Sequence, residues 1–137
     1  TRRSNMAKTI LTSSKLSAPA GVFSAGVSVP AGRMVFVSGQ VSRNAQGETV
    51  GKGDIRAQTT QTMENVKTVL EAAGATIDDV VKVTVYVTNV KDQLAPIHEV
   101  RAKYFKNDYP ASTLVEVKGL VSEDLLIEIE AIAVVAS

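Results

Sequence analysis

Hydrophobic residues follow two different periods along this chain, and each period predicts one kind of element. Between Asp54 and Gly74 apolar side chains recur every three or four residues, the spacing of one face of an α-helix. Asp54 is a good N-cap, and Gly74 suits the position just after a helix. Residues 81–87 instead alternate, with four valines on one side and Lys, Thr and Tyr on the other. We therefore predict a helix between Asp54 and Gly74, followed by a strand.

The remaining elements follow from the same reasoning. Residues 33–38 form a β-branched apolar run that is typical of a buried strand, and the turn 30–32 predicts a hairpin with residues 22–29. Asp92 predicts the cap of a second helix that reaches Phe105, with Pro96 in its first turn. This order predicts an α+β fold, a mixed β-sheet with two helices packed on one face. The other expected segments are a turn at 44–47 and strands at 48–50, 113–117 and 126–135.

The last predicted strand has one face that a single chain does not easily cover. Ile127 and Ile129 begin its inner face, whereas Glu128 and Glu130 share the outer face with Ile132 and Val134. A face that is half apolar and half charged suggests contact with another copy of the chain. A solvated sheet face with incidental apolar residues is the alternative.

Composition limits the classes of function. Hydrophobic residues make up 45% and charged residues 21%, as in a soluble globular protein, and aromatic residues only 4%. A net charge of +1 provides no field for nucleic acid or membrane, so we expect neither as a partner. The chain has no cysteine, which excludes disulfides and favours the cytoplasm. We interpret residues 1–5 as an expression remnant or a disordered leader, and residues 6–137 as one domain.

Isolated motifs give no strong signal. Residues 51–56 precede the first helix as a phosphate loop would, but Arg56 stands where a dinucleotide loop needs its third glycine, so we interpret the segment as a turn. His98 is the only histidine, and we expect no metal and no cofactor. A lone histidine on a helix is more often a surface or core-edge residue than a catalyst. Arg101, one helical turn further on, makes a small cationic pair with His98.

A set of longer blocks carries a stronger signal, and these blocks lie at residues 35–41, 58–74, 79–87, 104–105, 109–111 and 127–133. In their order and spacing they resemble the RidA/YjgF family, also described as endoribonuclease L-PSP-like. The resemblance covers nearly the whole chain from Ala18 to Ala133. It implies a chorismate-mutase-like fold, a homotrimer and ligand clefts between neighbouring subunits.

The family's deaminase branch hydrolyses enamine and imine intermediates such as 2-aminoacrylate, and the resemblance implies where its site residues fall. The family's key arginine follows a Pro-Ala pair and clamps the substrate carboxylate, but Ser112 stands there. Phe23 replaces a tyrosine, and His98 replaces an asparagine. Glu128 matches the acidic residue that positions the attacking water, and it is the one catalytic candidate. The ligand-binding candidates implied by the resemblance are Phe23, Ser38, Gly39, His98, Ser112 and Leu114.

Phe23, His98 and Ser112 all depart from the family's site residues. For the prediction of activity these three departures count for more than the matching blocks in the rest of the chain. We therefore predict a divergent RidA-like protein that binds a small metabolite in intersubunit clefts, with a re-tooled site and weak or no 2-aminoacrylate deaminase activity. The first alternative is a 2-iminobutanoate/2-iminopropanoate deaminase, a hydrolase that uses His98 or Arg101 as a substitute cation. A non-enzymatic ligand sensor comes next, and a ribonuclease last because the chain has no basic patch. Whether the chain is an enzyme stays open at this point.

Overall fold

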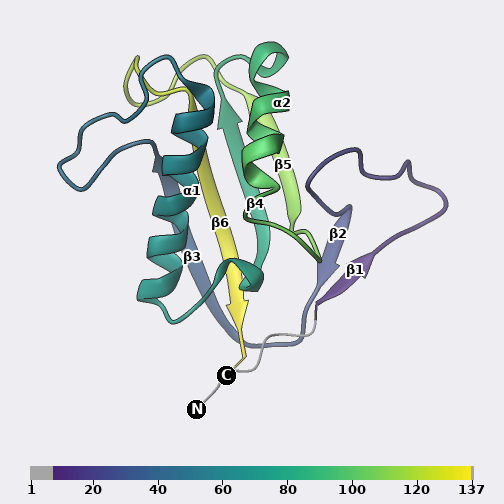
Figure 1. Cartoon of the computed structure of the whole chain (residues 1–137). Helices are drawn as coiled ribbons and strands as arrows, with labels where there is room; N and C mark the ends of the chain where they lie inside the picture. Colours follow the sequence, from purple (N-terminus) through teal and green to yellow (C-terminus); the bar gives the residue numbers. More distant parts are fainter. Residues whose placement is uncertain (1–7, 137) are drawn as a thin grey trace.

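Two helices lie across one face of a four-stranded mixed sheet (Figure 1). The computed structural model describes residues 8–136, and the expected leader, residues 1–5, lies outside the described residues. The strands of the sheet follow the order β3-β6-β4-β5, with β4 and β5 parallel and the other pairs antiparallel. The predicted α+β architecture is confirmed. The elements are β1 (Thr9–Leu11), β2 (Gly26–Ser28), β3 (Arg33–Val41), α1 (Ile55–Ala72), the 3₁₀ turn η1 (Ile77–Asp79), β4 (Val80–Val87), α2 (Val90–Arg101), β5 (Ala111–Glu116) and β6 (Ile127–Val135).

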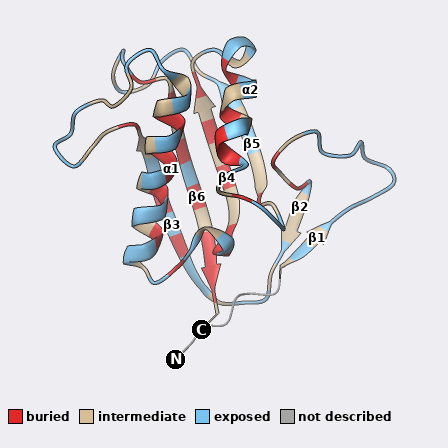
Figure 2. Ribbon diagram, viewed as in Figure 1, coloured by how far each residue is buried: buried red, intermediate tan, exposed pale blue. Residues whose placement is uncertain are grey.

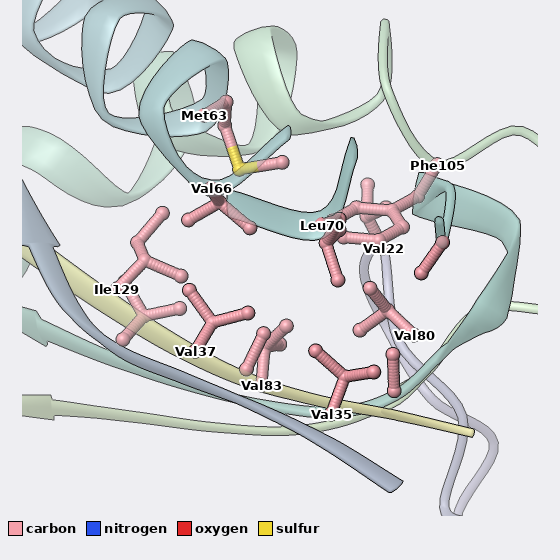
Figure 3. Packing of buried hydrophobic residues seen from close by; sticks show 14 of the residues in the cluster. Val22, Val35, Val37, Met63, Val66, Leu70, Val80, Val83, Phe105 and Ile129 are labelled. Atoms are coloured by element: carbon pink, nitrogen blue, oxygen red, sulfur yellow. The ribbon is translucent and has the colours of Figure 1, made fainter. Parts of the chain in front are cut away.

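The core fills the space between the sheet and the helices, and no described helix covers the other face of the sheet (Figure 2). Met63, Val66 and Leu70 descend from α1 onto the inner side chains of the strands (Figure 3). Alternation decides which strand residues take part, because successive side chains point to opposite faces. Along β6, Ile127 and Ile129 are buried as predicted, while Glu128 and Glu130, which alternate with them, face away from the helices.

The first part of the chain does not form the predicted hairpin. Residues 26–28 pair with β1 in a separate two-stranded sheet, and not with β3. The reason lies in the preceding residues, which join the opposite edge of the main sheet. Ser24 forms a parallel bridge with Ala111 of β5, and its N–H donates to the Pro110 carbonyl at 3.0 Å. The prediction of a strand at 48–50 is also wrong, because that segment forms only an isolated bridge.

The second helix begins earlier than predicted. It starts at Val90, and Asn89 caps it by accepting a hydrogen bond from the Asp92 N–H at 3.3 Å. Gln93 strengthens this start because its side-chain oxygen accepts from the Asn89 N–H at 2.9 Å. Pro96 therefore lies in the interior of the helix and not in its first turn. At this interior position proline removes one backbone N–H donor from the helix.

The amide of Gln58 ties α1 to the segment that leads into β6. Its Nε2 donates to the carbonyls of Gly51 and Asp124 at 3.1 and 2.8 Å, and its Oε1 accepts from the Leu126 N–H at 2.9 Å. The side chain is fully buried, so no water can replace these bonds. Gln58 therefore fixes where β6 begins, and with it the position of Glu128.

We expect Gln58→Leu to lower the free energy of unfolding by about 2–4 kcal/mol, because three backbone groups lose their hydrogen bonds to a fully buried side chain. Urea unfolding followed by circular dichroism measures this. Gln61→Leu is the matched control on the same helix, since Gln61 is only half-buried and its Nε2 donates to one side chain, that of Asn65. Equal losses for the two variants would contradict the role given to Gln58.

Candidate functional site

Ser112 faces the helices and contacts a buried cation. Its backbone pairs with Val83 of β4, whose side chain is buried beneath the helices, so the two side chains point to the same face. Arg101 lies in the last turn of α2, and its Nη2 donates to Ser112 Oγ at 3.2 Å and to the Val22 carbonyl at 3.5 Å. Only 1% of Arg101 is exposed. A guanidinium thus lies against Ser112, the residue at which the resemblance places the family's arginine.

The surroundings of Arg101 are neutral. The Phe105 ring centroid lies 5.8 Å from the guanidinium carbon, within reach of a cation–π contact. Among the described residues no carboxylate pairs with Arg101, and its buried Nε has no hydrogen-bond partner. Burial lowers the pKa of Arg101 to about 10, so the group is still charged at neutral pH. The fold therefore holds a positive charge that it does not neutralise.

His98 and Phe23 lie beside this cation. The His98 ring packs against Gly21 so closely that a Cβ at Gly21 would overlap it, and the same Cβ would lie 3.4 Å from Phe23 Cδ2. Glycine at position 21 makes this approach possible. Burial, and then the charge of Arg101, lower the pKa of His98, which favours a neutral imidazole at pH 7. Leu114 pairs with Val85 on the same face as Ser112 and packs against the core.

Glu128, Gly39 and Ser38 form a second group on the other face of the sheet. Glu128 lies between two buried isoleucines of β6, so its side chain points away from the helices. Its carboxylate occupies the space where a Cβ of Gly39 would lie, at an irregularity in the pairing of β3 with β6 between Val37 and Gln40. Ser38 is exposed on this side. Glycine at position 39 is therefore what lets the carboxylate lie against the β3 backbone.

The residues implied by the resemblance thus fall into two groups within one chain. The helix-side group consists of Phe23, His98, Ser112 and Leu114, and the outer group consists of Ser38, Gly39 and Glu128. A β-sheet separates the groups, since neighbouring side chains of a strand point to opposite faces. A single chain does not bring Ser112 and Glu128 into one pocket. Any site that uses both groups needs a second chain.

Two further residues belong to these groups. Arg101 was expected only as an alternative cation, and its spacing from His98 was the sequence signal for it. Tyr86 is the backbone partner of Glu128 on the outer face, where the carboxylates of Glu128 and Glu130 lie near its hydroxyl. Partial burial and the two carboxylates raise the pKa of Tyr86, which keeps the phenol protonated. The alternation of residues 81–87 put Tyr86 on the outer face, but not opposite Glu128.

The described residues hold no group of three or more histidine or acidic side chains arranged to bind a metal. No helix in the described part of the chain is long and apolar enough to cross a bilayer.

We expect the pKa of His98 to lie below its usual value of 6.5. In Arg101→Met this pKa should rise toward 6.5, because the variant removes the neighbouring positive charge. Because the unfolded chain binds this proton first as pH falls below 6.5, His98 makes stability decrease over that range. NMR titration of the His98 ring protons measures the pKa in both proteins. Arg56→Met is the control, since Arg56 pairs with Glu99 on the exposed side. An unchanged His98 pKa in Arg101→Met would contradict the geometry.

Comparison with known proteins agrees with this architecture. The family model described as Endoribonuclease L-PSP matches residues 13–135. A RutC family protein of Pyrococcus abyssi is 43% identical over 128 residues, covering 93% of this chain and 98% of its own length. A 2-iminobutanoate/2-iminopropanoate deaminase of Salmonella typhimurium is 39% identical over 132 residues, covering 94% and 98%.

A solved structure extends the comparison to three dimensions. The Rid-family protein YyfB of Yersinia pestis superimposes with a TM-score of 0.86 at 39% identity, covering 93% of this chain and 98% of its own. Two helices on one face of a mixed sheet are thus the chorismate-mutase-like fold that the sequence predicts. From the matched length, the level of identity and the shared fold, the chain belongs to the RidA/YjgF family.

Proposed function

We propose that this chain binds a small metabolite in clefts between the subunits of a homotrimer, through a site that differs from that of the deaminases in its family. The observation that carries the proposal is the separation of Ser112 and Glu128 by the sheet. A neighbouring chain can supply the missing half of each pocket, because a ring of three copies gives every subunit two different contacts. The ligand would then meet Arg101 and Ser112 from one subunit, and Glu128 and Gly39 from the next. The cytoplasm remains the predicted compartment.

The uncovered face of the sheet supports the association of chains. Met34 and Phe36 of β3 are 55% and 67% exposed, although both belong to an otherwise regular strand. Their backbone partners on β6 are Val134, which is buried, and Ile132, which is half-buried, so the exposed apolar surface on this face comes mainly from Met34 and Phe36. An apolar patch of this kind on a soluble domain indicates a contact surface. Packing against a second copy would remove it from water.

We expect light scattering at micromolar concentration to give about three times the 14.5 kDa mass of one chain. Phe36→Glu should shift the mass toward a monomer, because it places a charge in the apolar contact. Val121→Glu is the control, since Val121 is 76% exposed in a loop outside the sheet. A wild-type monomer, or a trimer that Phe36→Glu leaves intact, would refute this assembly.

Weak deaminase activity follows from the chemistry around Ser112. A serine hydroxyl offers one neutral donor where an arginine fork offers two charged ones. Arg101 brings a cation to the same place, but from a helix and not from the strand, so a bound carboxylate takes a different orientation relative to Glu128. Phe23 also lacks the hydroxyl group of the family's tyrosine. Binding would then survive while alignment for attack by water is impaired.

One observation favours a second function, that of a true enamine or imine deaminase. The contact between Arg101 and Ser112 places a charged fork beside the position that the family's arginine occupies. The substrates named for the Salmonella relative, 2-iminobutanoate and 2-iminopropanoate, are both carboxylates. If Arg101 orients such a carboxylate correctly, Glu128 of the next subunit can position the attacking water. The two functions differ in rate and not in the residues used.

A coupled assay that generates 2-aminoacrylate in situ and follows pyruvate release separates the two functions. We expect kcat/KM to be roughly 30-fold to several-thousand-fold below that of the Salmonella deaminase, the loss typical of a disrupted arginine–carboxylate contact. Glu128→Gln should abolish the residual rate, and Glu123→Gln, in an exposed loop, should leave it unchanged. A wild-type rate equal to that of the Salmonella protein would overturn the first function and establish the second.

A further inference from the structure

A hollow of about 370 Å³ lies between α1 and α2 on the side of the helices that faces away from the sheet. The two helices cover the same face of the sheet side by side (Figure 1). The side chains around the hollow are exposed or half-buried, except for the buried Val100. The hollow therefore belongs to neither group of candidate residues. An assembly formed through the uncovered face of the sheet would leave it open to solvent.

Two hydrogen-bonded pairs bridge the helices at the ends of this hollow. At one end Arg56 Nε donates to Glu99 Oε2 at 2.8 Å. At the other end the Tyr104 hydroxyl donates to Glu64 Oε2 at 2.7 Å. Arg56 and Glu64 are separated by eight residues of α1, which corresponds to about 12 Å along a helix. The space between the two pairs has the length of a small organic molecule.

Two charged groups beside the hollow are available to a ligand. Lys103 lies in the turn directly after α2, is exposed and forms no ion pair with any described residue. Glu64 uses only Oε2, since its Oε1 accepts no hydrogen bond from the described residues. Burial, and then the bond to Glu64, raise the pKa of Tyr104 to about 12, so the phenol keeps its proton and remains the donor to Oε2. The hollow thus offers a free cation and a free carboxylate oxygen.

The charges around the hollow balance one another. Arg56 and Lys103 are positive, and Glu64 and Glu99 are negative. Arg56 above all, and Lys103 to a smaller extent, lower the pKa of Glu99, which keeps this carboxylate charged at neutral pH. A ligand with a single charge is attracted by two of these groups and repelled by the other two. A zwitterion can place each of its charges beside a group of opposite sign.

The floor of the hollow is apolar. It consists of Val50 from the loop before α1, Ala57 from α1 and Val100 from α2. An apolar floor with a few polar groups at the rim is typical of small-molecule sites. Val50 and Ala57 lie toward the Arg56 end, whereas Lys103 and Glu64 lie toward the other end. A ligand with both charges at one end and an apolar group at the other matches this arrangement.

We propose that the hollow between α1 and α2 binds an α-amino acid with an apolar side chain, in its zwitterionic form. Lys103 Nζ pairs with the carboxylate of the amino acid, and Glu64 Oε1 accepts a hydrogen bond from its ammonium group. The apolar side chain lies on Val50, Ala57 and Val100. This site is separate from the proposed cleft between subunits and gives each chain a second ligand.

L-Leucine is the probe, and its affinity is measured by calorimetry or NMR titration of the whole protein at neutral pH. We expect a dissociation constant of about 1 mM or below, as suits a ligand of this size. 3-Methylbutylamine lacks the carboxylate and 4-methylpentanoate lacks the ammonium group, but both keep the apolar end. Each should bind about fivefold more weakly than leucine, because each loses one exposed ion pair. Glycine, which keeps both charges without the apolar end, should also bind more weakly.

Thr60→Trp tests the location of the site. Thr60 is exposed at the edge of the hollow, so a larger side chain there occupies the place of the ligand and should abolish leucine binding. Thr68→Trp is the matched control and should bind leucine as wild type does. Thr68 is exposed on the same helix outside the hollow, and the hydroxyls of both threonines donate to the carbonyl four residues earlier.

Two charge variants test the contacts and replace Thr60→Trp if that variant does not fold. Lys103→Gln should weaken leucine binding about threefold to fivefold without weakening the binding of 3-methylbutylamine, which has no carboxylate. Glu64→Gln should weaken leucine binding to a similar extent without weakening that of 4-methylpentanoate. Lys106→Gln, at an exposed position outside the hollow, is the control and should leave leucine binding unchanged.

Each outcome either supports or overturns the inference. A wild type that binds no leucine, or binds either singly charged analogue equally well, overturns it. Leucine that still binds Thr60→Trp but is lost in Glu128→Gln occupies the proposed cleft between subunits, which overturns the inference and leaves the proposed function standing. An assembly larger than a trimer that Thr60→Trp reduces would show that a second copy covers the hollow, which also overturns it. A monomer whose leucine binding is lost in Thr60→Trp supports the inference although the proposed trimer fails.

Discussion

The structure depends on one constraint, the alternation of side chains across a sheet that has helices on only one side. Each strand must supply apolar residues to the helix face, and the intervening residues then point the other way. On β6 this rule buries Ile127 and Ile129 and directs Glu128 outward. The same rule places Ser112 beneath α2 and leaves Phe36 exposed on β3. The alternation of side chains thus explains the buried core, the uncovered face of the sheet and the separation of the candidate residues into two groups.

Two glycines adapt this framework to bulky polar side chains. Gly39 leaves room for the Glu128 carboxylate against β3, and Gly21 leaves room for the imidazole of His98. In both places a Cβ would overlap the neighbouring side chain and push it away. The close approaches lie on opposite faces of the sheet, one in each group of candidate residues. Small residues thus fix the position of the larger ones in both halves of the proposed pocket.

Arg101 is a buried charge that lowers the stability of the fold. Burial lowers its pKa to about 10, which means that the folded chain holds the charged form at a disadvantage relative to the unfolded chain. Below that pH the disadvantage is fully present, because the group is charged in both states. A fold under selection for stability alone would place an apolar residue there.

The sequence by itself determined the elements whose pattern is local and strongly periodic. Asp54 and the helical spacing after it placed α1, and strict alternation placed β4 and β6 with the correct inner faces. The sequence also identified the family and named the candidate residues, because both depend on residue types in a fixed order. It was wrong about the partner of residues 26–28, and it placed Pro96 in the first turn of α2.

Only the tertiary structure decided which residues meet. Strand pairing joins segments far apart in the chain, and nothing in the local pattern of residues 22–29 reveals that Ser24 joins the edge of β5. The contact between Arg101 and Ser112 depends on how α2 packs against β5. The spacing of residues within either segment does not encode that packing. The division of the candidate residues between two faces also required the register of four strands. Periodicity fixes the face of each element, whereas packing fixes the neighbour on that face.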